Sequence, residues 1–330
     1  MKQGRGWGLC ALLAVVAPVL ASPPLEPAWE SGFDGRVLAH ARDLAMQGGA
    51  ENLYLAWRLT TTADLDANGI QAPELENVRG QWLQQALAAP GDSLLVARAA
   101  LLHCSTDSDC RQARANYQRL GGDDAGAWLR GDAAGHIDEA SWAAAAASGR
   151  YLSSFDVELP AVLQASAGLD LLSPPPGTVL DGLAYSGQDV LAATAVAALT
   201  IDTLQDPSMV VIRQCQAAAP GSLRDQQCRA IFEALAASPT LAQANLDAAL
   251  RASLATDAED HAQWQQRHRA LEWLFQRGVP LVGKQPVHAF LQQVAARGER
   301  AAWEEQLVQA GIPLQPPAGW GPELPPTAGP

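Results

Sequence analysis

The chain has 330 residues, of which 48% are hydrophobic, and 35 acidic residues outnumber 22 basic ones to give a formal net charge of −13. This length suits one large domain or two ordinary ones. An acidic chain repels phosphate backbones, and no basic stripe with interleaved aromatic residues is present, so the composition argues against a nucleic-acid partner.

Residues 1–21 are typical of a secretory signal peptide. Lys2 and Arg5 form a basic start, the apolar stretch Leu9–Leu20 follows, and a small residue precedes the predicted cleavage before Ser22. The apolar stretch is shorter than the about 20 residues that cross a bilayer. We therefore expect an exported protein, periplasmic or extracellular. Cleavage removes two basic residues and no acidic one, so 20 basic residues face 35 acidic ones and the mature net charge is −15.

The composition of the mature chain predicts an all-α protein. Ala, Leu, Gln and Arg, all good helix formers, are abundant, and aliphatic residues are mostly three and four apart. The apolar run Val190–Ile201 measures about 18 Å as a helix, short of a hydrocarbon core of roughly 30 Å, so it predicts a buried helix rather than a membrane anchor. The predicted helices span residues 34–46, 51–59, 73–87, 93–104, 110–120, 124–133, 138–151, 160–167, 188–204, 210–218, 223–236, 240–254, 259–277, 285–297 and 299–310.

Capping residues support several of these helices. Asp92 or Ser93 precedes one of them, and Pro239 suits the first turn of another. Gly278 and Gly298 stand where a C-cap glycine is expected. These residues predict where individual helices begin and end.

A loop between the second and third predicted helices has the first half of a calcium-binding pattern. Asp64, Asp66, Asn68 and Gly69 match positions 1, 3, 5 and 6 of an EF-hand loop. Glu74 falls one residue before position 12, where the bidentate glutamate belongs. Two interpretations remain open: a site for Ca²⁺ or a similar hard cation on these residues, and a plain inter-helix turn made by Asn-Gly. The turn is favoured.

Four cysteines remain after Cys10 leaves with the signal peptide, and an even count in an oxidising compartment predicts two disulfides. Three pairings can be drawn, and the spacing favours the local one, in which each bridge joins the end of one helix to the start of the next. The predicted bridges are Cys104–Cys110 and Cys215–Cys228. The alternative, a zinc site of the first pair with His103, is disfavoured by export.

A histidine-bearing helix late in the chain is a weaker metal candidate. His261 and His268 are seven residues apart, about 10 Å along a helix, so a single zinc ion does not bind both directly. His268 and Glu272 are four apart, and a surface ion pair is favoured over a metal site. No nucleophile, P-loop or dinucleotide motif is present, so no catalytic residue is predicted.

A Pro-rich segment, 173–177, is the predicted boundary between two helical halves. It separates an N-terminal half, residues 22–172, from a C-terminal half, residues 178–312. The Pro/Gly-rich tail, residues 313–330, is expected to be extended or disordered, although Trp320 could dock back onto the fold.

Helix pairs recur every 30 to 40 residues with short connections, as in an α-solenoid. The segment 121–152 is similar to a tetratricopeptide repeat, with Trp128 early in its first helix and the small residues 143–147 in its second. The layout resembles a group of exported bacterial helical-repeat proteins, through the C-x5-C between helices, the helix start Asp-Ala-Gly-Ala-Trp at 124–128, and AGIPLQPPAGW at 310–320. This resemblance implies a tetratricopeptide-like α-solenoid and an exported location, but no activity.

The sequence therefore favours an exported scaffold or binding module that holds a protein, peptide or envelope ligand on a concave face. Ten tryptophans favour core packing, with a peptide- or glycan-binding groove lined by some of them as the alternative. The second class of protein is an envelope hydrolase without a recognisable motif. A cleft that contains a carboxylate or histidine with a perturbed pKa would favour this enzyme.

Overall fold

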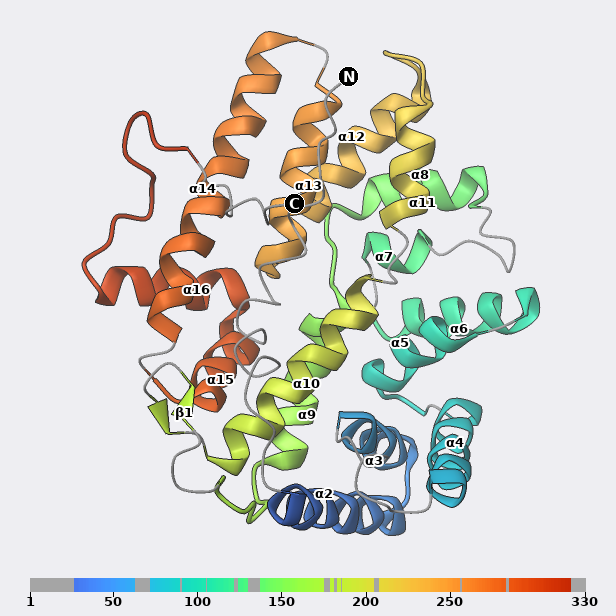
Figure 1. Cartoon of the computed structure of the whole chain (residues 1–330). Coiled ribbons are helices and arrows are strands. Elements are labelled where there is room, and N and C mark those ends of the chain that lie inside the picture. The colour runs from blue at the N-terminus through green and yellow to red at the C-terminus, as the bar shows by residue number, and fades with distance from the viewer. Residues whose placement is uncertain are drawn as a thin grey trace, which may run out of the picture.

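The computed structural model describes residues 27–62, 72–89, 91–104, 106–121, 124–129, 137–174, 179–180, 183–184, 186–204, 208–255, 257–282 and 285–321. Within these ranges the chain forms fifteen α-helices and one pair of two-residue strands (Figure 1). The predicted all-α class is therefore confirmed. No described helix combines the length and the apolar character that a membrane crossing requires.

The helices are α2 (Pro27–Gln47), α3 (Ala50–Thr62), α4 (Ala72–Ala88), α5 (Leu94–His103), α6 (Asp107–Arg119), α7 (Ala125–Trp128), α8 (Glu139–Ser148), α9 (Ser154–Ser166), α10 (Gly187–Leu204), α11 (Ser208–Gln216), α12 (Leu223–Ala236), α13 (Leu241–Ser253), α14 (Ala258–Val282), α15 (Val287–Arg297) and α16 (Glu299–Gln309). Strands β1 (Val179–Leu180) and β2 (Leu183–Ala184) pair antiparallel. Each predicted helix has a counterpart among these elements.

Helix α9 starts earlier than the predicted residue 160. Ser153 and Asp156 form a reciprocal capping box, in which Ser153 Oγ accepts from Asp156 N at 3.2 Å and Asp156 Oδ2 accepts from Ser153 N at 2.8 Å. Pro160 therefore lies inside the helix, where its ring removes one intrahelical hydrogen bond without ending the helix. The prediction gave the proline too much weight and missed the capping box.

Two predicted capping positions, Gly278 and Pro239, are wrong, and two, Ser93 and Gly298, are confirmed. Gly278 does not end α14, which continues to Val282, because the glycine makes room for an indole: a Cβ atom there would lie 2.1 Å from Cε3 of Trp303. Pro239 precedes α13 instead of starting it. Gly298 ends α15 as predicted, with a φ of +86°.

Helices α9 and α10 run through the middle of the molecule and join parts that are distant in sequence (Figure 1). They pack against each other, and both contact α3 near the N-terminus and α15 near the C-terminus. Phe155 and Val196 belong to a core shared with α13–α16, whereas Val162 and Leu191 belong to a core shared with α2–α5. Helices on the two sides of the Pro-rich segment 173–177 therefore share both cores.

A buried ion pair fastens α3 to α9. Glu158 Oε2 accepts hydrogen bonds from Tyr54 Oη at 2.6 Å and from Arg58 Nε at 2.8 Å, and all three side chains are buried. An ion pair of this kind fixes one arrangement of two helices, because removing one charged partner from the core is costly.

The described part of the C-terminal tail packs back onto α14. The Trp320 ring lies edge-on to Trp273, with ring centroids 5.3 Å apart. Trp273 Nε1 also donates to the carbonyl oxygen of Pro313 at 2.7 Å, and Arg269 donates to the carbonyl oxygen of Trp320. Up to residue 321 the tail is thus irregular, with a turn in which Trp320 N donates to the carbonyl oxygen of Pro317 at 3.1 Å, and it is held by its tryptophan. The residues after it lie outside the described ranges.

Candidate functional site

The cysteines pair locally, each bridge joining two successive helices. Cys104, which follows α5, is bonded to Cys110 in the first turns of α6, with an Sγ–Sγ distance of 2.01 Å. Cys215 in α11 is bonded to Cys228 in α12, at 2.00 Å. Both pairs are those favoured by the spacing in the sequence, and the sulfurs of the zinc alternative are bonded to each other.

Three ligands of the candidate calcium loop, Asp64, Asp66 and Asn68, lie outside the described residues. Glu74 belongs to the first turn of α4. Elsewhere, in the part of the chain that the structure describes, no group of three or more His, Cys, Asp or Glu side chains is placed to hold a metal ion. Calcium binding by the loop stays a hypothesis.

The predicted surface ion pair between His268 and Glu272 is wrong. Glu272 is buried because α13 packs against α14, and it accepts a hydrogen bond from Nδ2 of Asn245. His268 Nδ1 lies 2.7 Å from Oδ1 of the same Asn245, so the amide stands between the two side chains. Burial lowers the pKa of His268, partly offset by the Glu272 carboxylate.

Three further histidines contact groups on neighbouring segments of the fold. His40 Nε2 lies 2.7 Å from the carbonyl oxygen of Ala165, and His261 Nδ1 lies 2.9 Å from that of Ala252. His288 Nδ1 is 2.8 Å from Oδ1 of Asp189. These contacts fasten neighbouring segments, and the Asp189 carboxylate that His288 contacts also accepts from Ser186 N and Oγ at the start of α10.

Most tryptophans are core residues rather than groove residues. The tryptophans that are less than a tenth exposed are Trp29, Trp82, Trp142, Trp264, Trp273 and Trp303. Their indole rings fill the spaces between helices, which is the favoured interpretation of their number. A ligand groove must therefore be sought among other side chains.

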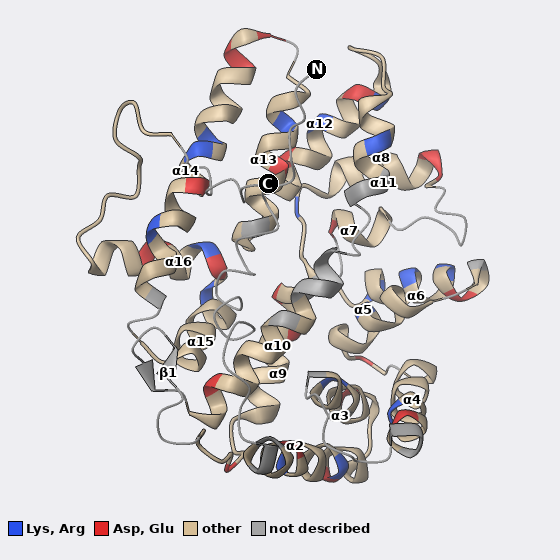
Figure 2. Ribbon diagram, viewed as in Figure 1, with Lys and Arg blue, Asp and Glu red and all other residues tan. Residues whose placement is uncertain are grey.

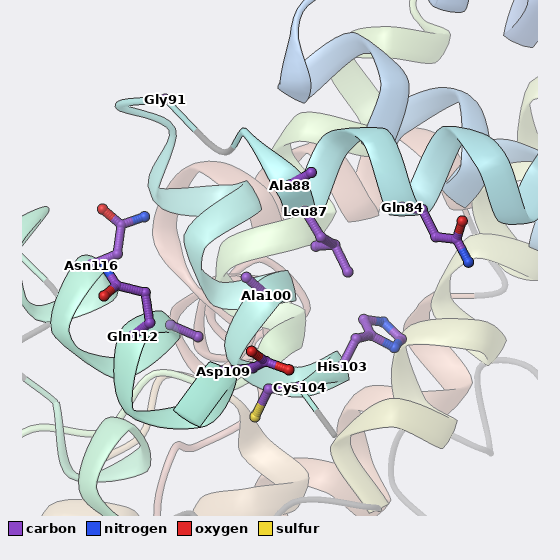
Figure 3. Close-up of a pocket in the computed structure, with 11 residues that line it drawn as sticks. Gln84, Leu87, Ala88, Gly91, Ala100, His103, Cys104, Asp109, Gln112 and Asn116 are labelled. Atoms are coloured by element: carbon purple, nitrogen blue, oxygen red, sulfur yellow. The ribbon is translucent and has the colours of Figure 1, made fainter. Parts of the chain in front are cut away.

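A groove of about 650 Å³ opens between α4, α5 and α6 (Figure 3). This volume lies within the range of ligand sites in proteins. Helix α4 contributes Gln84, Leu87 and Ala88, α5 contributes Ala100 and His103, and α6 contributes Asp109, Gln112, Ala113 and Asn116. The small side chains of Ala100 on α5 and Ala113 on α6 leave the volume of the groove unfilled, and amide side chains line its edges.

The sequence around the first disulfide sets the geometry of this groove. Ser93 caps α5 by accepting a hydrogen bond from Val96 N, and Thr106 caps α6 by accepting one from Asp109 N at 3.2 Å. The Cys104–Cys110 bridge joins the end of one helix to the start of the next. Because caps and bridge fix the turn between α5 and α6, they fix the residues that α6 presents to the groove.

Three amides line the two sides of the groove. Gln112 and Asn116 lie on α6, with Gln84 across the groove on α4 (Figure 3). The side-chain amides of Gln84 and Gln112 form no hydrogen bond with any described group, and Oδ1 of Asn116 accepts from Arg119 Nη2 at 2.8 Å. These groups can donate to and accept from a ligand.

A smaller cavity of about 270 Å³ lies where α9 meets the α15–α16 connection. Asp156 lines it, and burial raises the pKa of this carboxyl group. Its oxygens accept hydrogen bonds from Ser153 N and Oγ, both at 2.8 Å, and from Thr240 Oγ1 at 2.9 Å. The carboxylate thus caps α9 and holds the α12–α13 connection, which accounts for its burial.

The fold and the groove define an all-α protein with an amide-lined groove at a disulfide-bridged helix pair. No family model matches the chain, and neither a curated protein nor a solved structure matches it. Function is therefore inferred from the groove. Sequence reasoning missed its amides because exposed Gln and Asn are common on helices; their spacing of four residues just after the C-x5-C was the available signal.

Proposed function

We propose that the protein is an exported helical scaffold or binding module whose α4–α6 groove holds an extended segment of a protein or peptide in the cell envelope. Its helical hairpins are stacked as a tetratricopeptide-like solenoid in two halves. The single observation that carries this proposal is the groove itself: a cavity of about 650 Å³ whose amides on α4 and α6 are available to a ligand.

The spacing of the amides supports an extended chain as the ligand. Gln112 and Asn116 are four residues apart on α6, which places them about 6 Å apart along the helix axis. Alternate residues of an extended peptide are about 6.7 Å apart and point the same way. Each amide can both donate and accept, as the peptide backbone requires. Leu87 and Ala100 offer apolar contacts to its side chains.

Packing and cysteine chemistry support the solenoid and the exported location. Helices adjacent in sequence pack in pairs, namely α2 with α3, α3 with α4, α5 with α6, α7 with α8, α12 with α13, α13 with α14 and α15 with α16. Two disulfides favour an oxidising compartment. Basic and acidic residues are interspersed over the helices (Figure 2), as on a surface that remains in solution.

A pull-down from envelope extract tests the proposal. The mature protein is compared with the double variant Gln112→Ala/Asn116→Ala and with a matched control, Gln265→Ala/Gln266→Ala, which removes two exposed amides from α14. We expect a specific partner that the wild type and the control retain and the groove variant loses. A partner retained equally by all three proteins would show that the groove is not its site.

An envelope hydrolase is the second candidate, favoured by the raised pKa of Asp156 beside a cavity. The hydroxyl groups of Ser153 and Thr240 beside it are fully buried and engaged with this carboxylate, which suits a structural role better than a nucleophilic one. If the wild type turns over an ester or cell-wall substrate and a folded Asp156→Asn variant does not, the protein is a hydrolase rather than a binding module.

A further inference from the structure

We propose that the α4–α6 groove selects polypeptide segments that carry a cationic group, an ammonium or guanidinium, which binds the carboxylate of Asp109. This inference rests on the proposed peptide-binding function and adds a specificity to it. The groove lining contains two ionisable side chains, Asp109 and His103, both exposed, and Asp109 is its only carboxylate among the described residues.

The Asp109 carboxylate has no cationic partner among the described residues. It forms no ion pair with any residue that the structure describes, although α6 carries three arginines. Arg119 is paired with Asp92 at 3.2 Å and also bonds Asn116, and Arg114 donates to Ser141 Oγ at 3.2 Å. The Asp92 carboxylate thus has a cationic partner, whereas the Asp109 carboxylate lines the groove.

Asp109 is placed to bind a cationic group of the same ligand whose backbone contacts the amides. Asp109, Gln112 and Asn116 follow one side of the groove, from the end near His103 and Cys104 (Figure 3). Offsets of three and four residues keep them on one helix face, over about 10 Å. An extended peptide covers this length with about three residues. A cation two residues from the amide-bound backbone therefore reaches Asp109.

The net negative charge of the whole chain also favours cationic ligands. The formal net charge is −13, so cationic segments are attracted before contact and anionic ones are repelled. Contacts between exposed charges are individually weak. Asp109 therefore provides selectivity among peptides, and the backbone contacts provide the affinity that all peptides share. The cation could be a Lys or Arg side chain or the free N-terminus of the partner.

Fluorescence anisotropy with short synthetic peptides tests this selectivity. The probes are an acetylated peptide of alternating Ser and Ala labelled at its C-terminus, the same peptide with one central Lys, the same peptide with a central Glu, and the neutral peptide with a free N-terminus. We expect the wild type to bind the Lys peptide on the order of fivefold more tightly than the neutral one, and the Glu peptide more weakly. The free-N-terminus probe decides whether a terminal ammonium serves equally well.

Two variants assign the selectivity to one carboxylate. In Asp109→Asn the preference for the Lys peptide falls to the small part that the net charge of the chain contributes, while binding of the neutral peptide is kept. The matched control Glu259→Gln removes one negative charge from an exposed position on α14 and leaves the preference intact. Raising the salt concentration weakens binding of the Lys peptide more on the wild type than on Asp109→Asn, because only the wild type has the charge contact at the groove.

The outcomes separate this inference from the function on which it rests. Equal binding of neutral and Lys peptides by the wild type, or an undiminished preference in Asp109→Asn, overturns the charge selectivity and leaves peptide binding in place. Binding of an envelope oligosaccharide with no binding of any peptide at millimolar concentration overturns both. Circular dichroism confirms that each variant has the wild-type helix content.

Discussion

At the scale of the residue, the most consequential polar contact is the buried one between α3 and α9. Replacing Glu158 by Gln leaves Arg58 charged in the core without its carboxylate. We predict that this variant lowers the free energy of unfolding by about 3 kcal/mol, the cost of breaking a buried pair from one side. Urea denaturation measures it. Glu259→Gln, at an exposed position, is the reference and should change stability by less than about 0.5 kcal/mol.

Gly278 gives a second prediction, based on steric contact. Gly278→Ala drives a Cβ atom into the Trp303 indole, so we predict a loss of about 1 to 3 kcal/mol despite the better helix propensity of alanine. Gly80→Ala in α4 is the matched control, because no atom lies within 4 Å of a Cβ atom there. The melting temperature of Gly278→Ala should lie below that of the wild type and the melting temperature of Gly80→Ala above it. A stabilised Gly278→Ala protein would refute the close contact.

His268 makes stability depend on pH. Its pKa is lowered in the fold by burial, so the unfolded chain binds more protons than the native state below its ordinary pKa of about 6.5. The stability contributed by the neutral imidazole is present at higher pH and is lost as the pH falls from about 6.5 through the folded pKa. We predict that His268→Gln flattens the decline in melting temperature between about pH 7 and pH 5. An unchanged slope would mean that other groups cause the decline.

At the scale of the element, the two disulfides have separable roles. Cys104→Ser/Cys110→Ser should lower the free energy of unfolding by roughly 2.5 kcal/mol and Cys215→Ser/Cys228→Ser by roughly 3 kcal/mol, from loop entropy. Only the first pair borders the groove. Peptide affinity at a temperature where both variants stay folded is therefore predicted to fall for the first variant and to stay at the wild-type level for the second.

The helices themselves were largely predictable from local signals. Spacing of three and four, Ser93 as a cap and Gly298 as a terminator depend on residues that are neighbours in sequence. The errors came from contacts between distant segments. Gly278 lies mid-helix because Trp303 packs on it, and Glu272 is buried at a contact with α13, where Asn245 Nδ2 donates a hydrogen bond to its carboxylate. Periodicity within one helix contains no information about these partners.

At the scale of the whole molecule, sequence could indicate the helical class and the local cysteine pairs, but not the groove. The groove needs Gln84 from α4 and Gln112 from α6 on opposite sides of α5, and that placement follows from helix packing rather than from any motif. The central position of α9 and α10 is likewise a result of packing. A Pro-rich segment predicts a break in the helix, but it does not predict whether the flanking helices share a core.

The central claim is that the α4–α6 groove receives an extended polypeptide. Photo-crosslinking tests it most directly, with a photoreactive amino acid placed at Ala88 in the groove or, as the reference, at the exposed Ala262 on α14. In envelope extract we predict a crosslinked polypeptide from position 88 that position 262 does not give and that Gln112→Ala/Asn116→Ala abolishes. Crosslinks of equal yield from both positions, or none from position 88, would contradict the claim.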